Sequence, residues 1–310
     1  MFPTPRTMSI ALLLALAACS PKADTRTSDA ADTSAAMITA ATPYGANPSA
    51  SGTFTHDGVT LYYETYGEGE PLLMIHGNGG SIGTMAAQID HFRTKYKVIA
   101  MDSRDHGRSS DSPGALNYEV MTDDLAALLE HLKVGPAYVL GWSDGGIEAL
   151  LLGMRHPAKV KMIAAGAANL NPTAEALPQA TLTLVEKMLA SMSDSAKATT
   201  TGRREFKVMS MMTKEPNIAP AQLATITVPT LVMAADQDLI RGEHTLAIFN
   251  HLPLGQLAIF PNATHMIIFD DPATLNGTVA RFFATPFTRQ KDRIADMMAS
   301  YEKLLATMPK

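Results

Sequence analysis

Short apolar runs alternate with helix-like patterns along most of this chain, and this alternation limits the folds available to it. Helical spacing of apolar residues lies near 82–94, 118–132, 145–156, 242–251 and 272–284. Strands that alternate with helices usually pair in parallel, because each helix carries the chain back across the sheet. The sequence therefore predicts an α/β fold with a mostly parallel sheet and helices on both faces. The predicted strands are Leu72–Ile75, Val98–Met101, Ala137–Leu140, Val160–Ala165, Thr230–Ala234 and Leu257–Phe260.

The folded body is expected to begin near Thr53 with a hairpin. Two strand-like segments, Thr53–His56 and Val59–Tyr66, flank the dipeptide Asp57-Gly58. An Asp-Gly pair between two such segments favours a two-residue hairpin turn. We expect this hairpin to form the antiparallel edge of the sheet.

Residues 168–226 interrupt the alternation, since they are rich in methionine and helical patterns and poor in β-branched runs. We predict a small helical cap here, inserted into an α/β core formed by residues 53–167 and 227–287. The other interpretation is a pair of peripheral helices that do not cover a site.

A further helix is predicted over residues 288–310. Its apolar residues recur at helical spacing and are expected to pack on the body, with a dimer contact as the alternative. The sequence leaves open whether the protein is a monomer or a dimer. The residues are Ile294, Met297, Met298, Tyr301 and Leu305.

The first 18 residues resemble a bacterial lipoprotein signal peptide. Their apolar run at 10–18 is too short to cross a bilayer, and it leads to Leu-Ala-Ala-Cys at residues 16–19. In lipoproteins the cysteine of such a lipobox is lipidated, so the resemblance implies an anchor at Cys19 on a membrane surface. Ser20 follows the cysteine, and by resemblance to lipoprotein sorting this favours the outer membrane. The expected location is the cell envelope, periplasmic or surface-facing; the alternative is an ordinary signal peptide with an incidental Cys19.

Residues 19–52 are rich in Ala, Ser, Thr, Asp and Pro and poor in aliphatic bulk. Such a segment buries too little apolar surface to offset its ordering entropy, so we expect a flexible tether. The net charge of −5 gives no reason to expect a nucleic-acid partner. With Cys19 as the only cysteine, an intrachain disulfide is impossible, and no Cys/His spacing indicates a zinc site.

Ser143 is the candidate nucleophile. It lies in Gly-Trp-Ser-Asp-Gly at residues 141–145, after an apolar strand and before a helical pattern at 147–155. A G-x-S-x-G motif in this context forms a sharp strand-to-helix turn with the serine exposed at its apex. Small flanking residues are needed because backbone segments approach closely there. The alternative is a glycine-rich turn with an idle serine.

A second glycine-rich loop follows the strand at residues 72–75 and reads His-Gly-Asn-Gly-Gly at 76–80. Hydrolases with a nucleophile elbow take one oxyanion-hole N–H from such a loop and the other from the residue after the nucleophile. The candidates are the backbone N–H groups of Asn78 and Asp144, with Gly79 as the alternative to Asn78. We expect Gly77, Gly79 and Trp142 to border the substrate.

A serine hydroxyl needs a base, and the base needs an acid that orients it. The expected chain order is serine, acid, histidine. Asp236 and Asp238 both follow the strand at 230–234, and His265 follows a strand and a loop. His265 would lie at the carboxyl ends of the strands, where open α/β sheets bind ligands. The other two histidines after these acids, His244 and His251, lie in a helical pattern where solvent exposure is expected.

Together these residues resemble the α/β-hydrolase superfamily over roughly residues 53–286, the cap excepted. The elbow is similar to that of the biphenyl-hydrolase-like esterases, the family of valacyclovir hydrolase. The resemblance implies Asp238 rather than Asp236 as the triad acid, with Asp236 capping the following turn. It also implies that the Asp144 carboxylate could hold a cationic substrate group; solvent exposure or a helix cap are the alternatives. The cap does not match that family, so the resemblance carries the fold and triad but not the substrate.

The segment 102–109 resembles the loop that follows the fourth strand in this superfamily. We interpret it as structural, with Arg104 and His106 tying loops together. The alternative is a metal site formed by Asp102, Asp105 and His106.

The predicted function is hydrolysis of a small-molecule carboxylic ester, lactone or thioester through an acyl-enzyme, without a metal or an organic cofactor. Ser143 is the nucleophile, His265 the base and Asp238 the acid. One alternative is an amide hydrolase, such as an aminopeptidase, or a C–C bond hydrolase with the same triad. An alternative from another class is a catalytically inactive, surface-tethered ligand-binding protein.

Overall fold

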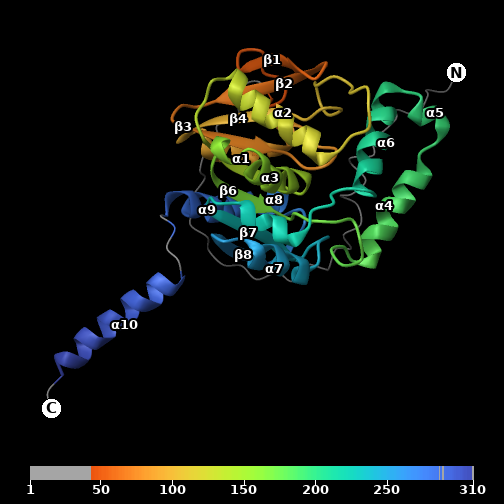
Figure 1. Ribbon diagram of the computed structural model, residues 1–310. Helices are drawn as coiled ribbons and strands as arrows, with labels where there is room; N and C mark the ends of the chain where they lie inside the picture. The colour runs from red at the N-terminus through yellow and green to blue at the C-terminus, as the bar shows by residue number, and fades with distance from the viewer. Residues whose placement is uncertain (1–42, 286, 288–289, 309–310) are drawn as a thin grey trace, which may run out of the picture. The chain divides into compact units, whose positions relative to one another are not determined.

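The computed structural model describes residues 43–285, 287 and 290–308, and within them eight strands form one sheet (Figure 1). The strand order is β1-β2-β4-β3-β5-β6-β7-β8. β2 pairs antiparallel with β1 and β4, and all other neighbours are parallel, which confirms the predicted α/β-hydrolase fold. The strands are β1 (Ser51–His56), β2 (Val59–Tyr66), β3 (Glu70–Ile75), β4 (Tyr96–Asp102), β5 (Ala137–Trp142), β6 (Val160–Gly166), β7 (Thr230–Gln237) and β8 (Gly255–Thr264).

The first two strands form the predicted antiparallel hairpin at one edge of the sheet, with His56 opposite Val59. Asp57 and Gly58 both have positive φ, 45° and 74°, as a two-residue turn of the I′ type requires.

The described chain is held against the body several residues before the expected start at Thr53. The backbone N–H groups of Gly45 and Asn47 donate to the Glu64 carboxylate at 2.7 and 2.8 Å. The Tyr44 ring packs edge-on against Tyr66, with ring centroids 4.8 Å apart. The end of the expected tether at residue 52 is therefore corrected, because a buried carboxylate and an aromatic pair fix the residues just before β1.

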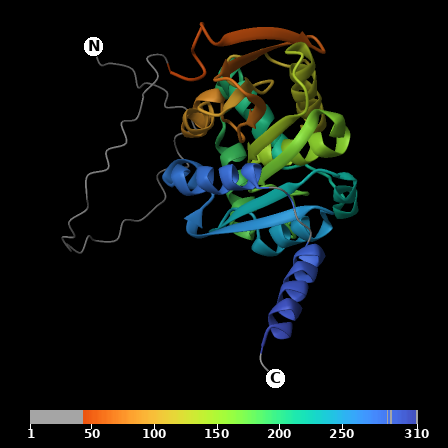
Figure 2. The same ribbon diagram turned by 90° about the vertical axis from the view of Figure 1, so that its left-hand side faces the viewer.

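Helices cover both faces of the sheet, and alternate residues of the central strands face the two layers (Figures 1 and 2). Leu73 and Ile75 of β3 belong to the layer beneath α2, α3 and α7, whereas Leu72 and Met74 belong to the layer beneath α1, α8 and α9. β5 is buried along its whole length. The helices of the core are η2 (Ile82–Met85), α1 (Ala86–Phe92), α2 (Tyr118–His131), α3 (Asp144–Arg155), η3 (Pro157–Lys159), α7 (Gly242–His251), α8 (Ile267–Asp270) and α9 (Pro272–Ala284).

The segment between β6 and β7 contains four helical elements: α4 (Gln179–Ser191), α5 (Asp194–Lys197), α6 (Thr200–Met212) and η4 (Pro220–Thr225). α6 is attached to the loop after β4, because Arg203 pairs with Asp111 at 3.0 Å and Lys207 with Asp105 at 3.2 Å. α4 has no buried residue. Of the two long helices of this insertion, α6 is therefore fixed by ion pairs, whereas α4 is in place without a buried residue.

The last described element is α10 (Gln290–Ala306). Its apolar side chains were expected to pack on the body, and this is wrong: they are about half exposed or more. Exposed side chains are Ile294, Met297, Met298, Tyr301, Leu304 and Leu305. The predicted signal peptide and Cys19 lie outside the described residues. Among the described helices, none combines the length and apolar character that a bilayer crossing needs.

Candidate active site

Ser143 occupies a strained turn between β5 and α3. Its φ of +60° is unusual for a residue with a side chain, and its N–H donates to Gly166 O at 2.8 Å. A Cβ at Gly141 would lie 1.9 Å from Gly145 O, and one at Gly145 would lie 2.2 Å from Ile75 O. The two glycines therefore let β3, β5 and α3 come together closely enough to lift Ser143 to the apex.

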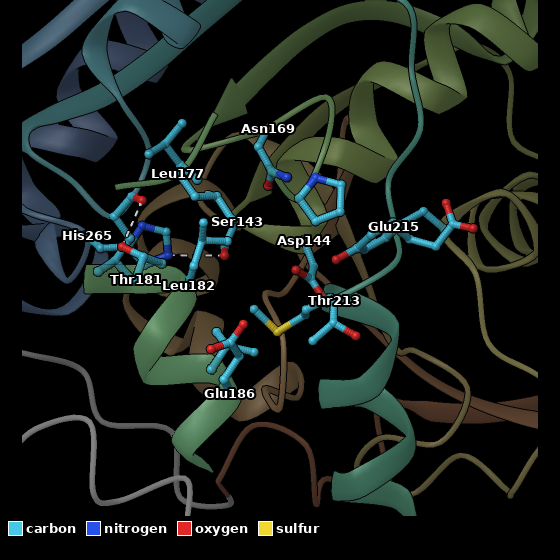
Figure 3. A pocket seen from close by; sticks show the side chains of 16 residues that line it. Ser143, Asp144, Asn169, Leu177, Thr181, Leu182, Glu186, Thr213, Glu215 and His265 are labelled. Carbon is cyan, nitrogen blue, oxygen red and sulfur yellow. Dashed lines mark hydrogen bonds between the residues drawn. The ribbon is translucent and has the colours of Figure 1, made fainter. Parts of the chain in front are cut away.

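The structure brings Ser143, His265 and Asp238 into hydrogen-bond contact, and Figure 3 shows the pair Ser143 and His265 at the pocket. His265 Nδ1 lies 2.6 Å from Asp238 Oδ1, and His265 Nε2 lies 3.1 Å from Ser143 Oγ. Because the ionised carboxylate only accepts, Nδ1 carries the ring proton and Nε2 is free to accept from the serine hydroxyl. This arrangement can move a proton from Ser143 to the imidazole.

Asp238 is ionised in its buried position because it is surrounded by donors. Burial alone would raise the pKa of its carboxyl, but the hydrogen bond and charge of His265 and the nearby backbone N–H groups hold that pKa below its usual value. Its oxygens accept from the N–H groups of Ala235 at 3.0 Å and Leu239 at 2.7 Å.

Asp236 is exposed, and its hydrogen-bond partners do not include His265. It accepts from the backbone N–H groups of Asn262 and Ala263 at 2.8 and 3.0 Å, so it braces the end of β8 rather than the turn that follows β7. His251 is exposed as expected, whereas the same expectation for His244 is wrong. His244 is buried because its Nε2 accepts from the Leu170 N–H at 3.0 Å.

Trp142 lies in the core below the site rather than against a substrate. Its indole N–H donates to the His265 carbonyl at 3.1 Å, and the residue is 4% exposed. The expectation that Trp142 borders the substrate is corrected: it holds the backbone of the histidine. Gly77 packs against Ser143, since a Cβ there would lie 3.1 Å from Ser143 Cβ.

The loop after β3 favours Asn78 over Gly79 as the oxyanion donor. The Gly79 N–H already donates to His106 Nε2 at 3.2 Å. Among the described residues, neither the Asn78 N–H nor the Asp144 N–H donates to a loop, cap or side-chain acceptor. The Asp144 N–H also has no acceptor within its own helix, because Asp144 is the first residue of α3.

Two buried histidines support this loop. His76 Nε2 accepts from the Ser103 N–H at 3.1 Å, and His106 accepts from Gly79. Burial lowers the pKa of both imidazoles to about 4, so both are neutral acceptors at neutral pH.

The acids at the end of β4 and in the loop after it serve as structural acceptors. Asp102 accepts from the N–H groups of Ile82 and Arg108, each at 2.8 Å, and Asp105 pairs with Lys207. These acids and His106 thus face separate partners. The described residues contain no cluster of three side chains suited to a metal ion.

A pocket of about 720 Å³, including its open mouth, lies over Ser143 and His265 (Figure 3). The insertion between β6 and β7 forms most of its wall, with Asn169, Leu177, Leu182 and Thr213 among the lining residues. Besides His265, its charged lining residues are Asp144, Glu186 and Glu215, all acidic. The involvement of Glu186 and Glu215 escaped prediction from sequence, because no spacing signal shows which residues of an insertion face a site.

The Asp144 side chain is buried and lines this pocket, so it neither points into solvent nor caps a helix. Asn78 Nδ2 donates to its Oδ2 at 2.9 Å, and the Tyr118 hydroxyl lies near enough to lower the pKa of the carboxyl. Burial raises the pKa of the Asp144 carboxyl, and these two donors only partly offset that effect.

A mostly parallel sheet with a serine at a strained turn after β5, an acid after β7 and a histidine after β8 defines an α/β-hydrolase fold. A family model described as "alpha/beta hydrolase fold" matches residues 70–217. This match covers just under half of the chain, and together with the sheet topology it establishes the α/β-hydrolase fold.

Individual relatives are distant. The 3-oxoadipate enol-lactonase 2 of Acinetobacter baylyi is 33% identical over 113 residues, which are 36% of this chain and 42% of the relative. The mouse serine hydrolase BPHL is 25% identical over 236 residues, 67% of this chain and 78% of the relative. The solved structure of MGS-M2, an alpha/beta hydrolase enzyme from a deep-sea metagenome library, has a TM-score of 0.66 at 20% identity and covers 77% of this chain and 100% of its own.

For several curated relatives, this lactonase among them, the match spans about two fifths of the relative's length.

Proposed function

We propose that this chain is a serine hydrolase that cleaves a carboxylic ester, lactone or thioester of a small molecule. The observation that carries the proposal is the His265 ring, which contacts Ser143 Oγ with one nitrogen and Asp238 with the other. These contacts give the imidazole the tautomer and the position that a general base needs.

In the first half-reaction, Ser143 Oγ bonds to the carbonyl carbon of the substrate while its proton passes to His265 Nε2. Asp238 stabilises the imidazolium, and the N–H groups of Asn78 and Asp144 bind the oxyanion. The bond between the carbonyl carbon and the alcohol or thiol then breaks, and this leaving group takes the proton from His265. The acyl group stays on Ser143.

In the second half-reaction, water gives one proton to His265 and bonds to the acyl carbon. The bond to Ser143 then breaks, and the proton returns from His265 to Oγ. The products are the carboxylic acid and the alcohol or thiol. For a lactone, they are two ends of one molecule.

The names of the relatives support this reaction class, since an enol-lactonase and a serine hydrolase are among them. A fluorophosphonate probe tests the nucleophile directly. We expect it to label the wild type at Ser143 and to leave Ser143→Ala unlabelled. An unlabelled wild type, or equal labelling of both proteins, would refute the proposal.

A substrate panel separates the remaining alternatives. Turnover of p-nitrophenyl esters and lactones, with slow or no turnover of aminoacyl amides, is expected for the proposed enzyme. Preference for the amides would indicate an aminopeptidase-like enzyme with the same triad. Failure to turn over any small ester would favour a ligand-binding protein.

A cationic group on the substrate is favoured by one observation, the acidic lining of the pocket. Asp144 is the buried member of that lining and the nearest along the chain to Ser143. If it binds an ammonium group, Asp144→Asn should lower kcat/KM for aminoacyl esters and leave plain acyl esters less affected. An unchanged ratio between the two substrate types would contradict this role.

We also propose that the enzyme is anchored in the cell envelope through a lipid on Cys19. The lipobox-like residues 16–19 support this location. Metabolic labelling with an alkyne fatty acid should mark the wild type and not Cys19→Ser. Equal labelling of both would contradict the anchor.

A further inference from the structure

The two proposed oxyanion donors belong to residues whose side chains also contact each other. Asn78 Nδ2 donates to Asp144 Oδ2 at 2.9 Å, linking the loop after β3 to the first turn of α3. These residues are 66 positions apart in the chain, so their backbone N–H groups depend on two separate elements for their spacing. The side-chain contact joins those elements at the point where the oxyanion would bind.

The same amide also reaches the insertion. Its nitrogen lies 3.5 Å from the carbonyl oxygen of Val208, which is buried in α6. A primary amide has two N–H donors, so one can serve Asp144 while the other faces α6. α6 is itself fixed to the loop after β4 by Lys207, which pairs with Asp105.

The acceptor is also held in place. Asp144 is 4% exposed, and among the described residues the Asn78 amide is the side-chain donor within hydrogen-bond distance of its carboxylate. A buried carboxylate that lost this donor would be left under-satisfied, which makes this contact costly to break. On the other side of the loop, the Gly79 N–H is fixed by His106.

We infer that the Asn78 side chain is a positioning residue that fixes the spacing of the two oxyanion donors and couples it to α6. This inference rests on the proposed function, because it assigns Asn78 a role in stabilising the oxyanions of ester hydrolysis. Both half-reactions pass through such an oxyanion, so both depend on this contact.

Asn78→Ala tests the inference, because it removes the amide and keeps the backbone N–H. With a neutral p-nitrophenyl ester, we expect kcat to fall by about 10- to 100-fold while KM changes by less than about threefold. Asn276→Ala is the matched control: Asn276 is a buried asparagine on α9 that donates to Ala87 O at 3.2 Å. It should lose a similar amount of thermal stability while keeping the wild-type kcat.

A reciprocal exchange separates positioning from general damage. Asn78→Asp sets two carboxylates against each other and should lower kcat further than Asn78→Ala. Adding Asp144→Asn to Asn78→Asp restores a donor and an acceptor with their places exchanged. We therefore expect the double variant to have a kcat at least tenfold higher than that of Asn78→Asp. This factor corresponds to about the free energy of one hydrogen bond to a charged group.

The outcomes separate the two claims. A wild type that turns over the ester, together with a wild-type kcat for Asn78→Ala or no recovery in the exchange variant, would overturn the positioning role alone. A wild type that neither hydrolyses esters nor reacts with a fluorophosphonate would overturn the proposed function, and the positioning role with it.

Discussion

The buried pair His76 and His106 should make the stability of this protein fall steeply in mild acid. Each imidazole has a pKa of about 4 in the folded protein, against 6.5 for an ordinary histidine. The unfolded chain therefore takes up protons first as the pH falls below 6.5. The free energy of unfolding is therefore unaffected by these two groups above pH 6.5. It falls progressively between pH 6.5 and about 4, where the unfolded chain binds more protons than the folded protein.

The size of the effect follows from these two pKa values. For one such histidine the linkage free energy is close to zero at pH 8 and about 2 kcal/mol at pH 5, so the pair contributes about 4 kcal/mol. Other groups oppose part of this change, since burial raises the pKa of the Asp102 and Asp144 carboxyls. A comparison of variants isolates the histidine contribution.

His106→Gln is the informative variant, because its side-chain oxygen can still accept from the Gly79 N–H and does not titrate. Urea unfolding of the wild type and the variant should be measured at pH 8 and pH 5. We expect the wild type to lose about 2 kcal/mol more than the variant over that interval. His251→Gln, at an exposed position, should keep the wild-type pH dependence. Identical pH slopes for the wild type and His106→Gln would refute a neutral, buried His106.

Three further changes have defined outcomes. Asp238→Asn should lower kcat for esters by about 10³- to 10⁴-fold, because the amide neither stabilises the imidazolium nor favours the required tautomer; steady-state kinetics measure this, and a tenfold loss or less would contradict the triad. Glu148→Met should stabilise the protein by about 1–3 kcal/mol in urea unfolding: both Glu148 oxygens are buried without a partner among the described residues, and burial raises the pKa of that carboxyl well above its usual value. Destabilisation would indicate that Glu148 has a partner. Gly145→Ala should lower stability by about 3 kcal/mol or more in thermal melts, since its Cβ would lie 2.2 Å from Ile75 O, and a wild-type melting temperature would argue against the close approach at the elbow.

The sheet and the positions of the site residues could be predicted because they depend on local signals that repeat along the chain. Apolar strand runs, an Asp-Gly turn and a G-x-S-x-G motif each have a short-range physical basis. Once the strands are placed, the parallel order brings their carboxyl ends together. Ser143, Asp238 and His265 each follow one of those ends, and the structure does bring them into contact.

Other features depend on tertiary contacts that no short-range pattern encodes. Trp142 lies next to Ser143 in sequence, yet its indole N–H donates to the His265 carbonyl. His244 sits in an amphipathic helix, yet it is buried because it accepts from the Leu170 N–H. The pocket wall depends on how α4 and α6 turn about their axes, and their apolar spacing alone does not fix this.

The uneven attachment of the two long inserted helices has a consequence for substrate preference. α6 is fixed by ion pairs to the loop after β4, whereas α4 contributes Thr181, Leu182 and Glu186 to the pocket without burying a residue of its own. Substitutions on α4 are therefore expected to change the shape of the pocket above Ser143 with little effect on the stability of the fold. For the hydrolase proposed above, substrate preference could therefore change through α4 while Ser143, His265 and Asp238 stay the same.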